Sequence, residues 1–383
     1  MNRILIQGGM LCTMADGVTE PFLGDILIED GRIRQIGTEL PVGDAELIDA
    51  TGLYVLPGLF EAHAHIGLFD FSQETTFSDA NESSDPVHAA LDARYGVNPR
   101  AREFRAAYQY GITDMLLTPG SSNVYCGLAF VAKSYGDNIF DMTVKAPAAV
   151  KIALGGNPKK YFGAYGRLPV TRMGVAQLLW DTFRRAQEYL AQQEAGQQPA
   201  YDADLEALLP ALRGEIPCKI HCTQHDILTA LEFANHFGLR FSLEHAWGAE
   251  EYLDEIIASG GAICFGPIAT YRAPGERRRV DVTAVKALDA AGVNVAMVTD
   301  SPFYSEESLY HHIGEVVRDG VPHMRALRMV TINPVRQLGL EQRLGSLEAG
   351  KDADLILVQG RLGLDTDARV LLTMIDGRVV YQR

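Results

Sequence analysis

Several apolar, strand-like runs of this sequence end in a histidine or an acidic residue. One run ends in His63 and His65, and three later runs end at His221, His245 and Asp300. Side chains alternate along a strand, so His63 and His65 project from the same face. Two imidazoles on one face of a stiff element can bind one transition-metal ion with little ordering cost. The pattern predicts a fold in which strand ends carry a metal site.

Size and charge narrow the class of protein. With 383 residues and 47% hydrophobic content, the chain can bury the core of one large domain and a smaller one. The formal net charge of −15 argues against a nucleic-acid partner, because phosphate binding needs a basic surface. The run at residues 3–6 is strand-like rather than an export signal, and no apolar run approaches the ~20 residues that span a bilayer. We therefore expect a soluble, cytoplasmic protein that acts on a small molecule, without a membrane partner, as a homo-oligomer.

The cysteines do not form a disulfide pattern. There are five of them, an odd number without paired spacing, which fits a reducing compartment. Cys218 and Cys222 flank His221 and could suggest a zinc knuckle. Strand alternation, however, points both away from the face that His221 occupies. We do not expect them to be metal ligands.

The two ends of the chain are β-rich. Asp30-Gly31 and Asp376-Gly377 are turn signals between strands, because this pair tolerates positive φ. The expected strands are residues 3–7, 24–29, 32–36, 46–49 and 54–56 at the start, and 353–358, 370–375 and 378–381 at the end. Small unpaired sheets are marginal alone, so pairing is favoured over two independent extensions. We expect residues 1–57 and 345–383 to form one composite β-sandwich domain.

The middle of the chain, residues 58–344, alternates strand-like and helix-like stretches. The expected strands include 112–118, 148–154, 218–221, 240–245, 262–265 and 293–299, and the expected helices include 100–110, 175–193, 227–236, 250–259, 282–291 and 324–331. Alternation of this kind indicates βα units around a parallel sheet. About eight units can be drawn, although the third is poorly defined. This α/β pattern predicts a TIM-like (β/α)8 barrel, whose active groups lie at the C-terminal ends of the strands.

Each polar residue has an ordinary explanation when it is taken alone. His63, His65, His221 or His245 could be a structural core histidine, and Asp300 could cap a helix. Their shared position at strand ends of one barrel makes a single site the simpler explanation. Three imidazoles and a carboxylate suit zinc or a similar divalent ion, with an open position for water.

Lys151 adds a further possibility, because it lies inside an otherwise apolar strand. A buried, unpaired ammonium is costly. Carbamylation by CO₂ would give it two oxygens that could bridge two cations. The alternative is a lysine at the rim, paired with a carboxylate such as Asp300. Lys145, in the preceding run, is the competing candidate for the bridging role.

Taken in order, these residues and several longer motifs resemble the metal-dependent amidohydrolase superfamily. The matching segments are Val55-Leu56-Pro57-Gly58-Leu59, His63-X-His65, Val150-Lys151-Ile152-Ala153-Leu154, Thr331-Ile332-Asn333-Pro334 and Leu344-Gly345-Ser346-Leu347-Glu348-Ala349-Gly350-Lys351-Asp352-Ala353-Asp354-Leu355. The end segments resemble the branch that contains imidazolonepropionase and the prolidase-like carboxypeptidases. Glu61 stands where the family usually has Asp. The connection at residues 155–161 is unusual, so the resemblance carries no substrate.

The resemblance implies a role for each candidate. His63, His65 and Asp300 would hold the more buried metal, His221 and His245 the second, and a carbamylated Lys151 would bridge them. A metal-activated hydroxide would cleave a C–N bond of an amide, a cyclic amide or a dipeptide-like substrate, with Asp300 moving the proton and His245 beside it. The expected cofactor is a divalent metal, zinc in preference, with two ions favoured over one.

Substrate contacts are expected on the loops that follow the strands. The candidates are Tyr161, Gln224, His225 and Arg272. Arg272 could hold a carboxylate through two parallel hydrogen bonds, or it could be a surface arginine. His225 could polarise a substrate carbonyl, or it could cap the helix that begins at Asp226.

Two other functions are also compatible with the sequence. A one-metal deaminase or imidazolonepropionase-type hydrolase acting on a nitrogen heterocycle would use unmodified Lys151, and His245 would contact the reactive water. The number of bound ions separates this alternative from the two-metal hydrolase. A non-catalytic barrel is the third possibility, but a protein of that kind is expected to have lost ligands, and all six positions are filled here.

Overall fold

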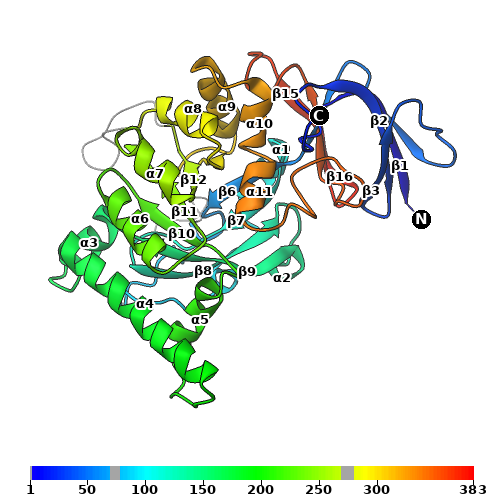
Figure 1. The fold of residues 1–383 in the computed structure, drawn as a ribbon. Coiled ribbons are helices and arrows are strands. Elements are labelled where there is room, and N and C mark those ends of the chain that lie inside the picture. The colour runs from blue at the N-terminus through cyan, green and yellow to red at the C-terminus, as the bar shows by residue number, and fades with distance from the viewer. Residues whose placement is uncertain (1, 70–77, 269–279) are drawn as a thin grey trace.

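The computed structural model describes residues 2–69, 78–268 and 280–383. The described chain contains two eight-stranded sheets, one formed by the ends of the chain and one by its middle (Figure 1). The first sheet contains β1 (Arg3–Leu11), β2 (Phe22–Glu29), β3 (Arg32–Gly37), β4 (Glu46–Asp49), β5 (Tyr54–Pro57), β14 (Leu355–Gln359), β15 (Arg369–Ile375) and β16 (Arg378–Gln382). The second contains β6 (Leu59–Ala64), β7 (Ile112–Leu117), β8 (Tyr125–Lys133), β9 (Thr143–Ala153), β10 (Cys218–Cys222), β11 (Phe241–His245), β12 (Ala262–Phe265) and β13 (Val295–Met297).

The first sheet joins the two ends of the chain, as predicted. Its order is β16-β15-β14-β5-β1-β2-β3, with β4 beside β1, and the antiparallel pair β5 and β14 is where the ends meet. Asp30 and Gly31 turn the chain with φ of 47° and 82°, and Asp376 and Gly377 do so with φ of 48° and 71°. These positive values are the ones that a two-residue hairpin turn requires. The division of the chain into domains after residues 57 and 344 stays a prediction.

The second sheet is a nearly closed barrel. Its order is β13-β12-β11-β10-β9-β8-β7-β6, and its two end strands, β13 and β6, contact each other. Residues Met329 and Val330 lie between them and accept hydrogen bonds from the backbone amides of Met297 (2.9 Å) and Phe60 (2.8 Å). The largest hydrophobic core of the described chain joins residues of the barrel strands, such as Val150, Ile220 and Leu243, with residues of the surrounding helices.

One strand departs from the expected uniform (β/α)8 pattern. Strands β9 to β13 are parallel neighbours, as are β6 and β7, but β8 runs antiparallel to both β7 and β9. The physical reason is the length of the connections. A parallel crossover needs a dozen or more residues, whereas seven join β7 to β8 and nine join β8 to β9. The poorly defined third unit is therefore an antiparallel strand.

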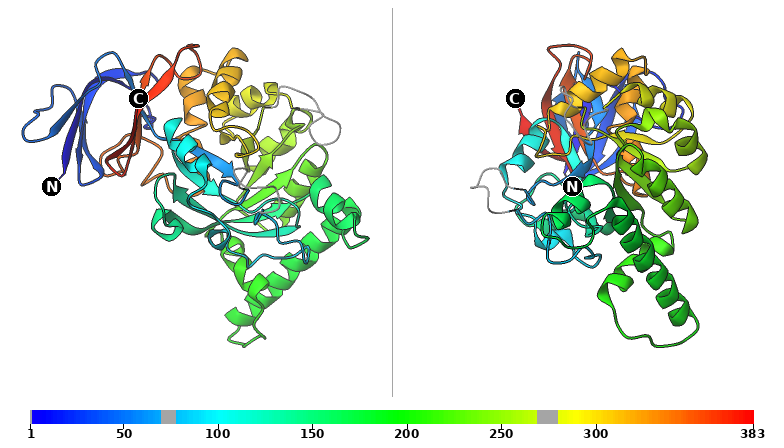
Figure 2. Two further views of the ribbon diagram at one scale, coloured as in Figure 1. Left: turned by 180° about the vertical axis from the view of Figure 1, so that it is seen from behind. Right: turned by 90° about the vertical axis from the view of Figure 1, so that its left-hand side faces the viewer.

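Helices cover the outside of the barrel. They are α1 (Arg102–Gln109), α2 (Ile139–Met142), α3 (Gly156–Gly163), α4 (Arg172–Glu194), α5 (Ala203–Leu212), α6 (Asp226–His236), α7 (Leu253–Ser259), α8 (Thr283–Ala290), α9 (Ser308–Arg318), α10 (His323–Arg328) and α11 (Ile332–Gln337). Short 3₁₀ turns lie at Ala93–Tyr95 and Ala249–Glu251. Figure 2 shows that α4 extends away from the barrel with α5 beside it. Among the described helices, none is both long enough and apolar enough to span a bilayer.

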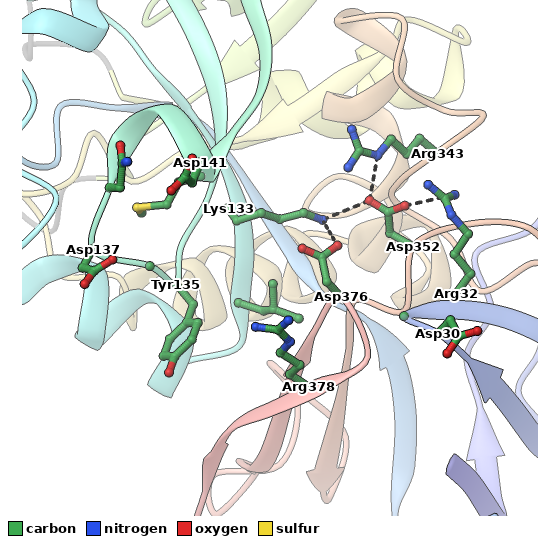
Figure 3. Close-up of a pocket in the computed structure, with 15 residues that line it drawn as sticks. Asp30, Arg32, Lys133, Tyr135, Asp137, Asp141, Arg343, Asp352, Asp376 and Arg378 are labelled. Atoms are coloured by element: carbon green, nitrogen blue, oxygen red, sulfur yellow. Dashed lines mark hydrogen bonds and ion pairs between the residues drawn. The ribbon is translucent and has the colours of Figure 1, made fainter. Parts of the chain in front are cut away.

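A buried ion cluster joins the barrel to the terminal sheet. Lys133, at the end of β8, forms ion pairs with Asp114 of β7 (3.2 Å) and with Asp352 (3.3 Å). It also pairs with Asp354 and with Asp376, which lies at 3.5 Å. Figure 3 shows Lys133 extending from the barrel toward Asp352 and Asp376. The ammonium lies among four aspartates and supplies positive counter-charge to them from within the chain.

Candidate metal centre

Six predicted residues lie at one end of the barrel. His63 belongs to β6, Lys151 to β9 and His221 to β10, while His245 ends β11 and Asp300 follows β13. His65 comes directly after β6. All six side chains are buried. Because the carboxyl ends of parallel strands meet at the same edge of a sheet, scattered sequence positions become neighbours.

His63 lies at the centre of this group. Its Nε2 is 3.1 Å from Nζ of Lys151 and 3.8 Å from Oδ1 of Asp300. Its ring centroid lies 5.1 Å from that of His65 and 4.8 Å from that of His245. On the other side of the ring, Nδ1 lies 2.6 Å from Oε2 of Glu244. The ring therefore separates the candidate site from a buried carboxylate.

Three of the histidines are held in the same way. Nδ1 of His65 lies 2.7 Å from the carbonyl oxygen of Thr118, and Nδ1 of His245 lies 2.8 Å from that of Gly266. A carbonyl or carboxylate oxygen accepts only, so Nδ1 carries the proton in each of these contacts. In a neutral imidazole the lone pair is then on Nε2, which is the atom available to a metal.

Electrostatics favours neutral rings. Burial, with a contribution from nearby His221, lowers the pKa of His245 to about 3. Burial and the Lys151 ammonium hold the pKa of His63 well below its usual value. Both rings are therefore unprotonated at Nε2 near neutral pH and can act as metal ligands.

Positive backbone φ turns two of the candidate ligands into the site. His245 has φ of 66° and Asp300 has φ of 59°. This conformation is uncommon for residues other than glycine and is found mainly where the surrounding structure imposes it, often at functional sites. At His245 the turn ends strand alternation, so Glu244 and His245, although consecutive, both contact His63.

Asp300 is placed to be ionised. Burial acts to raise the pKa of its carboxyl group, but the polar contact with His65 and the nearby Lys151 ammonium outweigh it, so the pKa lies below the usual value. Oδ1 lies 3.3 Å from Nε2 of His65. A buried carboxylate among lone-pair nitrogens is a suitable ligand set for a divalent cation.

The structure separates the two lysine candidates. Lys151 is fully buried inside the barrel rather than at a rim, and within the described residues it forms no ion pair with a carboxylate. Burial lowers the pKa of its amine. Lys145 lies outside this group, where its Nζ donates to the carbonyl oxygen of Leu338 at 2.8 Å. The competing interpretation for Lys145 has no support in this geometry.

Glu61 connects the two strands that flank the closure of the barrel. Its carboxylate accepts from the amide of His63 (3.0 Å), the amide of Thr299 (3.0 Å) and the hydroxyl of Thr299 (2.7 Å). Burial nevertheless raises the pKa of Glu61 to about 8. Glu61, which stands where the resembled family usually has Asp, thus fixes the strand that bears His63 against the segment that leads to Asp300.

The donor set fits a divalent metal. One ligand atom each from His63, His245 and Asp300 lie within 4.8 Å of one another. The ring of His221 lies 4.7 Å from that of His245, centroid to centroid. Imidazole nitrogens and a carboxylate are the ligands that zinc and similar ions prefer. Cys218 and Cys222 are buried, and burial raises the pKa of Cys218 to about 12, which opposes the thiolate that a zinc knuckle needs.

The predicted substrate contacts are less well defined than the ligands. Tyr161 lies on α3, with its ring next to that of Tyr165. Gln224 has φ of 53° and donates its backbone N–H to Trp247. His225 is exposed at the start of α6, where its side chain makes no capping hydrogen bond. Arg272 lies outside the described residues.

Sequence reasoning missed a group of charged residues below the site. Glu244 and Lys219 are fully buried and form an ion pair of 2.9 Å. The available signal was the one used for Lys151, namely a charged residue inside an apolar strand. Lys219 is aligned with Lys151 on the neighbouring strand, so two lysines enter the barrel interior at one level.

Comparison with known proteins gives a consistent result. Residues 170–381, over half of the chain, match the model of the amidohydrolase family. An amidohydrolase structure from Thermotoga maritima MSB8 has a TM-score of 0.94 and 32% sequence identity, covering 99% of this chain and 100% of that one. The amidohydrolase tasK of Hapsidospora irregularis is 28% identical over 88% of this chain, which spans only 38% of that protein. A 5-methylthioadenosine/S-adenosylhomocysteine deaminase of Symbiobacterium thermophilum is 24% identical, covering 100% of this chain and 94% of that protein.

Proposed function

The chain belongs to the amidohydrolase family, and we propose that it is a metal-dependent hydrolase that cleaves the C–N bond of an amide, a cyclic amide or a dipeptide-like substrate. The observation that carries this proposal is the convergence of His63, His245 and Asp300, whose ligand atoms lie within 4.8 Å of one another. Their burial and the lone pairs on their inward-facing nitrogens support a metal site rather than a set of structural histidines.

Two ions are favoured over one. His63, His65 and Asp300 would hold the more buried ion, and His221 and His245 the second, with zinc as the expected metal. A divalent ion bound there supplies a lowered pKa for water and polarisation of a carbonyl oxygen. The protein ligands would be divided between two ions, so a coordination position would remain for water.

Lys151 is the proposed bridge. Its buried amine has a lowered pKa, and the neutral form is the one that attacks CO₂. A bond forms between Nζ and the carbon of CO₂, one proton leaves the nitrogen for solvent, and the product carries one negative charge on two oxygens. That charge would offset the excess positive charge that two cations bring to a buried site.

Asp300 is the proposed acid–base residue. Its carboxylate is held ionised and contacts the imidazoles of His63 and His65, so it is directed at the centre of the ligand group. It would take a proton from the attacking water and deliver that proton to the leaving nitrogen. His245, 4.8 Å from His63 between ring centroids, borders the same space.

The test combines metal analysis with a substrate screen. Metal-free protein is reloaded with zinc and assayed against N-acyl amino acids, dipeptides and cyclic ureas. The proposal predicts hydrolysis by the reloaded protein and close to two ions per chain. One ion per chain, with ammonia released from a nitrogen heterocycle, would favour the mononuclear deaminase or imidazolonepropionase-type activity instead. A protein that takes up no metal would contradict both activities.

A further inference from the structure

A buried carboxylate contacts His63 on the side away from the candidate metal site. Oε2 of Glu244 lies 2.6 Å from Nδ1 of His63, and both side chains are fully buried. Among the three histidines with a resolved Nδ1 contact, His63 is held by a charged group, whereas backbone carbonyls hold His65 and His245. The contact with His63 is therefore the one that a side-chain substitution can remove.

Glu244 is itself fixed in place. Its other oxygen, Oε1, accepts from the hydroxyl of Ser242 at 2.5 Å and pairs with Nζ of Lys219 at 2.9 Å. Both oxygens are thus engaged, which leaves the carboxylate one orientation. Because Lys219 and Ser242 both donate to Oε1, Oε2 is left as the acceptor of the hydrogen bond that Nδ1 of His63 donates.

Lys219 is anchored in turn by the floor of the barrel. Nζ donates to Sγ of Cys264 at 3.1 Å and to Oε1 of Gln337 at 3.4 Å. Gln337, at the end of α11, donates from Nε2 to the carbonyl oxygen of Ile263 at 3.1 Å. The chain of contacts therefore runs from α11 and β12 through β10 and β11 to the histidine on β6.

We propose that Glu244, held by Lys219 and Ser242, is a positioning residue that fixes the Nδ1-protonated tautomer of His63 and so presents Nε2 to the metal. This inference rests on the proposed function and deepens it. A carboxylate behind a metal-bound imidazole fixes the ring and raises the basicity of the ligand nitrogen, and removing such a partner typically weakens metal affinity by about 10- to 100-fold.

The experiment compares zinc affinity and tautomer state in three variants of the full chain. Glu244→Gln keeps the size of the side chain but removes its charge and leaves Lys219 unpaired. Lys219→Met/Glu244→Gln removes both charges, so the buried unpaired ammonium no longer disturbs folding. Glu348→Gln is the matched control, because Glu348 also bridges a serine two residues before it (Ser346) and a lysine (Lys351, 2.8 Å), but in a part-exposed position beside the terminal sheet.

Zinc titration of metal-free protein provides the first measurement. Zinc affinity is expected to fall by about 10- to 100-fold in Glu244→Gln and in the double variant, and to stay at the wild-type value in Glu348→Gln. Recovery of wild-type affinity in the double variant would overturn the inference, because Glu244 would then serve only to neutralise Lys219. Wild-type affinity in Glu244→Gln would overturn it as well.

Nitrogen chemical shifts of the imidazole rings in metal-free protein provide a second measurement that needs no metal. The wild-type protein is expected to show His63 protonated at Nδ1, and the double variant a mixture of tautomers. A wild-type ring protonated at Nε2 would overturn the inference. Failure of wild-type protein to bind zinc would instead contradict the proposed metal-dependent function, so the two failures can be told apart.

Discussion

Nζ of Lys151 lies 3.1 Å from Nε2 of His63 in the closed interior of the barrel. Burial lowers the pKa of this lysine, and no ion-paired carboxylate among the described residues compensates, so the amine is poorly placed as a permanent cation. Conversion to an anionic carbamate would give the side chain two oxygens beside His63, and two ions could share them.

Replacing Lys151 by alanine is therefore expected to reduce zinc content from about two ions per chain to one or fewer. The reason is loss of the bridging oxygens, which would hold the two ions together. Elemental analysis of the dialysed protein measures this, and intact-mass analysis of the wild-type protein is expected to show the added mass of CO₂. An unchanged zinc content in Lys151→Ala would contradict the bridging role. Lys145→Ala, outside the ligand group, is the matched control.

Asp300→Asn is expected to lower kcat by about 10²- to 10⁴-fold with a much smaller change in KM, as loss of a general acid–base group does. The amide keeps the size of the side chain but cannot accept and return a proton. Steady-state kinetics, with a substrate that the screen identifies, measures the changes in kcat and KM separately. Retention of most of the turnover would remove Asp300 from the proposed proton transfer.

The sequence was most informative where its local patterns match the local structure. The turns at Asp30-Gly31 and Asp376-Gly377 and the histidine pair at the end of β6 need only short-range rules, and the structure has them where the sequence predicts them. No strand was expected at β8, because the third unit of the pattern was poorly defined. Its two connections have seven and nine residues, which is too short for a parallel crossover.

Contacts between distant segments were harder to foresee. Strand alternation predicts that Glu244 and His245 face opposite sides, and only the positive φ of His245 brings both to His63. Likewise, Lys151 and Lys145 both lie in β9, and the local pattern could not decide between them. The structure places Lys151, rather than Lys145, in contact with His63, and the bridging role itself stays a prediction.

Lys133 is expected to have a pH-dependent effect on stability. Burial, together with the charge of Asp114, raises the pKa of Asp354 to about 8, and Lys133 opposes that shift. A carboxyl group whose pKa is raised on folding destabilises the folded state increasingly as pH rises from about 4, its unfolded value, through its folded value. Without the lysine, this destabilisation is no longer offset.

Lys133→Met should therefore lower the free energy of unfolding by about 3–5 kcal/mol at pH 8.5, and by less at pH 5, where Asp354 is protonated in the folded state. Denaturant titrations at the two pH values measure the difference. The exposed Lys160 of α3 supplies a control, Lys160→Met, with little effect at either pH. Equal losses for Lys133→Met at both pH values would contradict the account of this cluster.

Gly58 is expected to tolerate no side chain. A Cβ at this position would lie 2.0 Å from Oγ1 and 2.6 Å from Cβ of Thr113 on the neighbouring strand. Gly58→Ala should therefore destabilise the protein by about 1–3 kcal/mol, as overpacking does. Gly163→Ala is the control, because its nearest contact would be 3.6 Å. Thermal unfolding compares the two, and similar midpoints would show that the strands can separate without penalty.

The convergence of histidines and Asp300 into one metal site is tested most directly by calorimetric titration of metal-free protein with zinc. The account predicts saturation at two ions per chain in the wild-type protein and loss of this binding in His63→Ala/His245→Ala. A wild-type protein that binds no more zinc than the double variant would contradict it.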